Sequence, residues 1–150
     1  MPVERPVAIL IVLFGSLLAY RGLGAVGVDY FATLMASARA AIATMFLFTA
    51  ASHFAPMRKD LIAMVPPSLP RPELLVLLTG IAELAGAVGL LTPWLRFWAA
   101  SGLILLLVLM LPANISASRR AVLLRGRRAT SLWIRVPMQV LFIAWIWAVR

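Results

Sequence analysis

The chain contains four long apolar segments, and a shorter apolar segment precedes them. A segment that crosses a bilayer as a helix needs about 20 mostly apolar residues. The mean hydropathy of +1.01 and the charged content of 13% are also far from the average of soluble proteins. The sequence therefore predicts an all-α fold, a polytopic membrane helical bundle in which residues 1–150 form a single transmembrane domain. The predicted spans are residues 7–28, 32–53, 73–91, 94–113 and 131–149.

The first of these spans is the shortest in its apolar core. The uninterrupted run Val7–Tyr20 is 14 residues long, but Arg21 can snorkel and Gly22–Val28 can extend the helix. A cleavable signal peptide is the alternative. It is disfavoured because Glu4 offsets Arg5 and no clear small-residue cleavage motif follows. We therefore expect four core helices plus one extra N-terminal helix, with four crossings as the alternative.

The net charge of +9 is distributed unevenly between the two ends of such a bundle. With five crossings, three basic residues lie on one face: Arg21, Arg96 and Arg150. Nine lie on the other: Arg5, Arg58, Lys59, Arg71, Arg119, Arg120, Arg125, Arg127 and Arg128. The positive-inside rule then places the nine in the cytoplasm and predicts a multi-pass membrane protein with the N-terminus inside and the C-terminus outside. We interpret the basic loops as topology determinants that contact anionic lipid, and we expect no nucleic-acid partner.

Glu83 lies near the middle of the apolar stretch Leu74–Leu91. A carboxylate at that depth costs several kcal/mol unless it is paired, protonated or hydrated, so it suggests a functional site. At about 100° per residue, Glu83 shares one helix face with Gly80 and Gly86, and small residues favour contact between helices. Glu83 is therefore expected to point inward. The alternative is a structural role, with a protonated Glu83 hydrogen-bonded to Gln139.

Further polar residues are predicted to form a ladder from the cytoplasmic face to mid-membrane. His53 and Asn114 are expected at the cytoplasmic boundary, where Asn114 would cap the end of the fourth span after Pro112. Arg135 and Gln139 follow four-residue spacing on the last span and are expected to be about 6 and 12 Å deep. Arg39 is separate, about 10 Å inside the outer face. Each of these five has a structural alternative: an interfacial histidine, a helix cap, an interhelical hydrogen bond or a snorkelling arginine.

The segment between the second and third spans holds prolines at positions 56, 66, 67, 70 and 72, so it cannot be one continuous helix. Its Met57–Met64 part predicts a short amphipathic helix in the membrane interface, with Met57, Leu61 and Met64 on one face. We interpret the methionines of the chain as scattered core or lipid-facing residues.

Four sequence blocks resemble the DoxX-like family of small bacterial membrane proteins over about Ala38 to Trp147. The blocks are HFAPMRKDLIAMVPPSLPRPELL, GIAELAGAVGLLTPWLR, PANISA and RVPMQVLFIAW, in the expected order. The resemblance implies a four-helix bundle, here with one extra N-terminal segment, in a bacterial plasma (inner) membrane, and a redox-associated role. It implies that five residues occupy the family's recurring polar positions: His53, Glu83, Asn114, Arg135 and Gln139.

Three classes of function remain open. The first is a redox-associated accessory subunit that holds a quinone or another lipophilic ligand and works with a membrane or cytoplasmic redox protein. The second is an intramembrane enzyme in which Glu83 and His53 act as catalytic acid and base on an epoxide, alkene or sterol-like substrate. The candidate ligand-binding residues are Asn114, Arg135, Gln139 and Arg39. The third is a proton-coupled carrier, which is disfavoured because no inverted repeat is visible. Heme and zinc are disfavoured and no metal site is expected, because the chain has one histidine and no cysteine.

Overall fold

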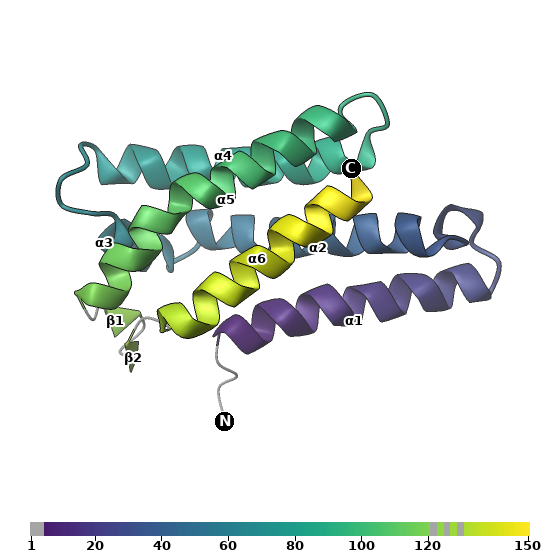
Figure 1. Ribbon diagram of the computed structural model, residues 1–150, viewed down its shortest axis with the longest axis horizontal. Helices are drawn as coiled ribbons and strands as arrows, with labels where there is room; N and C mark the ends of the chain where they lie inside the picture. Colours follow the sequence, from purple (N-terminus) through teal and green to yellow (C-terminus); the bar gives the residue numbers. More distant parts are fainter. Residues whose placement is uncertain (1–4, 121–122, 125–126, 129–130) are drawn as a thin grey trace.

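The computed structural model describes residues 5–120, 123–124, 127–128 and 131–150, and it is an all-α helical bundle as predicted. In the described residues the α-helices are α1 (Arg5–Ala25), α2 (Leu34–Phe54), α3 (Arg58–Met64), α4 (Pro72–Leu91), α5 (Arg96–Arg119) and α6 (Leu132–Val149). A 3-10 turn, η1 (Asp29–Phe31), precedes α2, and two short strands, β1 (Leu123–Leu124) and β2 (Arg127–Arg128), pair antiparallel between α5 and α6. Figure 1 shows this arrangement.

Five of these helices, all except α3, are long and apolar enough to cross a membrane. They correspond in order to the five predicted spans, and the first of them is the N-terminal segment Pro6–Ala25. Length and composition therefore define a multi-pass membrane protein with a helical bundle.

The largest difference from the predicted helix boundaries is at the end of α5. This helix continues to Arg119, so Pro112 and Asn114 lie inside it. The prediction that Asn114 caps the end of this helix is wrong. The extension is stabilised by tertiary packing, because Ala117 in the last turn is buried against Met64 of α3.

Helix α2 is central, since it packs against α1, α4 and α6, while α4 packs against α5 and α5 against α6. Small residues on the buried faces allow these close approaches. On α4, Gly80, Glu83 and Gly86 are buried while Ile81 and Leu84 are exposed, which confirms the predicted inward face. Helix α1 packs against α2 from the outside of the four-helix group formed by α2, α4, α5 and α6.

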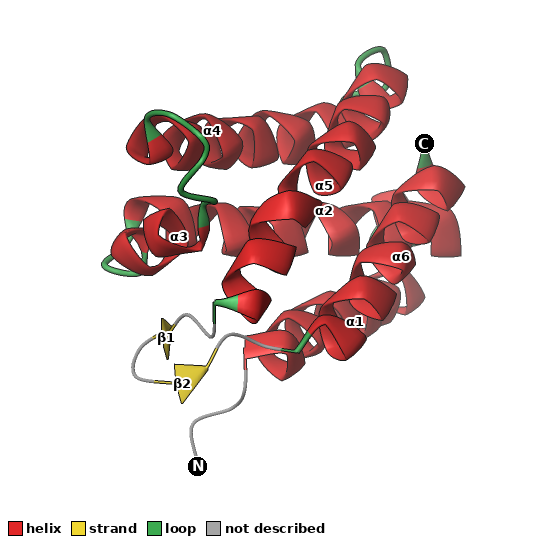
Figure 2. Ribbon diagram, turned by 60° about the vertical axis from the view of Figure 1, so that its left-hand side comes forward, coloured by secondary structure: helices red, strands yellow, loops and turns green. Residues whose placement is uncertain are grey.

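The two ends of the bundle differ. Helix α3 and the β1–β2 pair lie at one end, together with the start of α1 (Figure 2). The predicted short helix around Met57–Met64 is confirmed as α3, with Met64 buried and Leu61 packed against it. The α1–α2 and α4–α5 connections lie at the opposite end, near the C-terminus (Figure 1). Five of the six polar residues predicted from the sequence line a cavity at the α3 end, and Arg39 does not.

Candidate functional site

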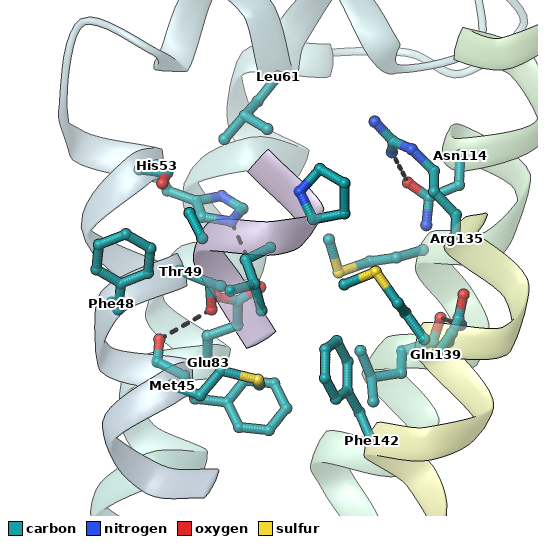
Figure 3. Close-up of a pocket in the computed structure, with 18 of the residues that line it drawn as sticks. Met45, Phe48, Thr49, His53, Leu61, Glu83, Asn114, Arg135, Gln139 and Phe142 are labelled. Atoms are coloured by element: carbon teal, nitrogen blue, oxygen red, sulfur yellow. Dashed lines mark hydrogen bonds and ion pairs between the residues drawn. The ribbon is translucent and has the colours of Figure 1, made fainter. Parts of the chain in front are cut away.

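A cavity of about 420 Å³ lies inside the α3 end of the bundle. It is lined by residues from α1, α2, α4, α5 and α6 and from the segment around α3. Five of the six predicted site residues contribute to its wall: His53, Glu83, Asn114, Arg135 and Gln139. They come from four helices that are distant in sequence, so the fold alone brings them together (Figure 3).

His53 and Glu83 form a buried pair on one wall of the cavity. Nε2 of His53 lies 3.5 Å from Oε1 of Glu83, and each side chain is only 5% exposed. The other ring nitrogen, Nδ1, lies 2.8 Å from the carbonyl oxygen of Val76. The second carboxylate oxygen, Oε2, accepts a 2.8 Å hydrogen bond from the hydroxyl of Thr49. The imidazole and the carboxyl group are thus each fixed at both ends.

The hydrogen-bond partner of Nδ1 fixes the tautomer of His53. A carbonyl oxygen can only accept, so Nδ1 of His53 must carry a hydrogen and donate it to Val76. Nε2 then faces Oε1 of Glu83, and one further proton held between these two atoms would make their contact attractive. With that proton on nitrogen the pair is an imidazolium and a carboxylate, and with it on oxygen the pair is neutral. Both forms have no net charge, which is the condition under which a carboxyl group is tolerated in an apolar interior.

The close approach of α4 to α2 sets the position of His53. A Cβ atom on Gly80 would lie 2.5 Å from Cβ of His53, so only glycine fits there. The hydroxyl of Thr79 lies 3.3 Å from Nδ1 of His53 and donates to the carbonyl of Val76 at 3.0 Å. The glycine predicted to serve helix packing therefore also holds the imidazole against α4.

A second polar group lies across the cavity, on α5 and α6 (Figure 3). Nη1 of Arg135 donates a 2.6 Å hydrogen bond to Oδ1 of Asn114. The amide of Gln139 donates to the carbonyl oxygen of Leu107, one of the main-chain groups of α5. The alternative in which Glu83 is hydrogen-bonded to Gln139 is therefore wrong, because the two residues belong to separate sets of contacts. The cavity has an acid–base wall and, facing it, a wall with a guanidinium and two amides.

Arg39 is the one predicted site residue that does not line this cavity. Its Nε donates a 3.0 Å hydrogen bond to the carbonyl oxygen of Val149, the last residue of α6. Carbonyls at the end of a helix lack main-chain donors, and arginine side chains commonly supply them. Arg39 thus caps α6 at the end of the bundle opposite to α3.

The rest of the cavity wall is apolar and rich in methionine. Five of the seven methionines of the chain line it: Met45, Met57, Met64, Met110 and Met138. Phe46, Phe48 and Phe142 add aromatic surface. Unbranched, polarisable methionine side chains adapt to irregular ligands. The interpretation of the methionines as scattered is wrong, because residues from separate elements converge here.

Sequence reasoning also missed Thr49 and Ser52, which line the same cavity. The signal for Thr49 was its position four residues before His53, which places both side chains on the same face of α2. Threonine is ordinary in a membrane helix, so this spacing gains meaning only once Glu83 is known to face it.

The fold and the cavity together define a multi-pass helical-bundle membrane protein with a polar, methionine-lined pocket inside the bundle. The chain belongs to the family DUF8561, a domain of unknown function, which matches residues 42–150. No curated protein and no solved structure matches the chain. The matched region begins within α2 and includes all seven polar residues that line the cavity, whereas α1 lies outside it.

Proposed function

We propose that this protein is a redox-associated accessory subunit of the bacterial inner membrane, of the DoxX-like kind, which holds a quinone in the cavity at the α3 end. One observation carries this proposal: a buried acid–base pair, His53 and Glu83, faces a guanidinium–amide pair, Arg135 and Asn114, across an apolar cavity. A quinone has a flat apolar ring with an oxygen at each of two opposite positions. The two polar walls match those two oxygens in chemistry.

The residues of the cavity fit such a ligand in size and in donor set. A volume of about 420 Å³ falls within the usual range of small-molecule pockets, about 300–1,000 Å³. Arg135 offers charge-assisted hydrogen bonds to a carbonyl oxygen, and Asn114 orients the guanidinium. The phenylalanine and methionine side chains supply the apolar surface for a ring.

The His53–Glu83 pair would hold and move a proton at the ligand. A bound quinone supplies two-electron chemistry coupled to the uptake of two protons. Glu83 would give one proton toward the cavity, which leaves one negative charge on the pair until a proton from the aqueous phase at the α3 end reaches it. The second proton that the quinone takes up would follow the same route. Thr49 keeps the carboxyl group oriented during this transfer. The electrons come from a redox protein, for which we propose docking at the α3 end of the bundle.

Lipid extraction from the purified protein tests this proposal. We expect a quinone at about one per chain in mass spectra of the extract, with a matching quinone absorbance of the purified protein. Glu83→Gln should lower the retained quinone by about tenfold, the effect of losing the hydrogen bond that the carboxylic acid donates to the quinone. Glu73→Gln is the matched control, since it makes the same change on an exposed residue in the first turn of α4. Wild-type protein that retains no quinone above a detergent blank would refute the proposal.

A second candidate function is acid–base catalysis on a lipophilic substrate. It is favoured by the contacts that fix a buried acid, Glu83, next to a base, His53. Thr49 holds the acid and the carbonyl of Val76 holds the base. This chemistry needs no redox partner. Such a pair can protonate an epoxide or alkene at one position and remove a proton at another. Turnover of an added epoxide, alkene or sterol by quinone-free protein would favour this candidate over the first.

A further inference from the structure

Helix α3 covers the end of the cavity. Met57, which precedes α3, and Leu61 and Met64 within it line the cavity from that side. Leu61 is labelled at the upper edge of the pocket in Figure 3, on the far side of His53 from Glu83. With only seven residues, α3 is too short to be stable alone, so its position depends on what holds it.

The sequence leaves the last turn of α3 short of hydrogen-bond donors. In a continuing helix the carbonyl of Ala63 would accept a hydrogen bond from residue 67, but that residue is Pro67, which has no N–H. Pro66 likewise cannot serve Ile62, whose carbonyl accepts instead from the N–H of Val65 at 3.1 Å. In the described part of the chain, no main-chain N–H bonds the carbonyls of residues 63, 64 and 65. These acceptors need a donor from elsewhere.

Arg120, directly after α5, supplies that donor. Its Nη2 lies 2.9 Å from the carbonyl oxygen of Ala63, 3.1 Å from that of Met64 and 3.0 Å from that of Val65. Nη2 carries two hydrogens, so the three carbonyls share them. Nε of Arg120 donates to Oγ of Ser116 at 2.9 Å, which fixes the guanidinium on α5. A single side chain thus fastens the end of α3 to α5.

We propose that Arg120 is a positioning residue that holds α3 closed over the cavity, and that release of this contact opens the cavity for ligand exchange at the α3 end. The part that concerns a ligand rests on the function proposed above. The part that concerns the cover does not, because it depends only on the contact between Arg120 and α3. Arg120 itself does not line the cavity, so its substitution removes no contact to a bound ligand. The rates of ligand exchange should therefore change more than the equilibrium affinity.

A thiol on the inner side of α3 reports opening without any ligand. The chain has no cysteine, so Leu61→Cys gives one unique site for labelling with a water-soluble maleimide. Adding Arg120→Ala should raise the labelling rate by about tenfold, because charge-assisted hydrogen bonds to three carbonyls are lost. Arg119→Ala is the matched control. It removes the same charge one position earlier, and within the described residues the Arg119 side chain makes no hydrogen bond. Its effect should stay below about twofold.

Quinone exchange is measured in the cysteine-free chain with a decyl-substituted benzoquinone as the probe. Arg120→Ala should raise the association and dissociation rates together by about tenfold. Arg120→Lys keeps the charge and three N–H donors but loses the bond to Ser116. Its exchange rates should lie between those of wild type and Arg120→Ala, and it replaces the alanine variant if that variant does not fold. Equal labelling rates in the Arg120 and Arg119 variants would overturn the proposal. Faster labelling in Arg120→Ala, with no binding of the benzoquinone to wild type, would support the role of Arg120 in holding α3 and refute the quinone function.

Discussion

The hydroxyl of Thr49 donates a 2.8 Å hydrogen bond to Oε2 of Glu83, from the turn of α2 directly before His53. One helix therefore provides both partners of the buried carboxyl group, with the threonine on one oxygen and the imidazole on the other. This relationship turns Glu83 from an isolated acid in an apolar span into the centre of a hydrogen-bonded group.

Removal of the Thr49 hydroxyl should weaken this group without a change in side-chain shape. Thr49→Val should lower the free energy of unfolding in detergent by about 1 kcal/mol, the usual net value of one hydrogen bond. It should also lower ligand retention, because Glu83 loses its orientation. Thr49→Ser keeps the hydroxyl and is the control. A valine variant equal to wild type in both denaturant unfolding and ligand retention would contradict a role for this contact.

Substitutions of Glu83 separate a working acid from a structural residue. In Glu83→Gln the amide oxygen can accept from Thr49 and the amide nitrogen can donate to Nε2 of His53, so stability should stay near that of wild type while ligand retention is lost. Glu83→Leu leaves His53 and Thr49 without this partner and should lower the free energy of unfolding by about 1–3 kcal/mol. The checks are denaturant unfolding and mass spectrometry of bound ligand. If Glu83→Gln retains as much ligand as wild type while Glu83→Leu unfolds the bundle, Glu83 is a structural residue.

Gly80 should tolerate no larger side chain. A Cβ there would lie 2.5 Å from Cβ and 2.9 Å from Cγ of His53, so Gly80→Ala must displace the imidazole or separate α4 from α2. We expect a loss of about 1–3 kcal/mol in the free energy of unfolding, together with loss of ligand retention. Gly102→Ala in α5 is the control, since nothing lies within 4 Å of its added Cβ. The control should be neutral or stabilising by up to about 1 kcal/mol, because alanine favours the helix.

The sequence allowed prediction of the spans and of the direction in which Glu83 points, because both follow from hydropathy and from the helical period along one segment. It did not allow prediction of the partner of Glu83, since that depends on which helices are neighbours. The structural alternative pairs Glu83 with Gln139 on the last span, whereas α4 in fact packs against α2 and presents Glu83 to His53.

The same limit explains the errors at Asn114 and at the methionines. The end of α5 was placed too early because Pro112 normally disfavours helix, yet packing of Ala117 against Met64 extends the helix past it. The methionine wall is built from α2, α5, α6 and the region of α3, and no single segment carries its pattern. Local periodicity describes one helix at a time, whereas a cavity is a property of the assembled bundle.

The contact between Arg135 and Asn114 should make a measurable energetic coupling across the α5–α6 interface. Their hydrogen bond is short, 2.6 Å, and charge-assisted, so a double-mutant cycle with Arg135→Gln and Asn114→Leu should give a coupling of about 1.5–3 kcal/mol. The measurement is denaturant unfolding of the two single variants and the double variant. Arg135→Lys keeps the positive charge but not the planar fork, and it should retain only part of the coupling. Additive effects within about 0.5 kcal/mol would contradict the contact.

The orientation of the bundle in the membrane is the last prediction, and it depends on the uneven distribution of basic residues. A reporter fused after Arg150 should report the exterior, and a reporter at the N-terminus should report the cytoplasm, because an odd number of crossings separates them. The same reporter near Arg125, which lies outside the described residues, should report the cytoplasm. Placement of the Arg125 and Arg150 reporters on the same side would mean that α6 does not cross, despite its length and hydropathy. Placement of the N-terminal reporter outside, with the other two as expected, would mean that α1 does not cross and that the other four apolar helices do.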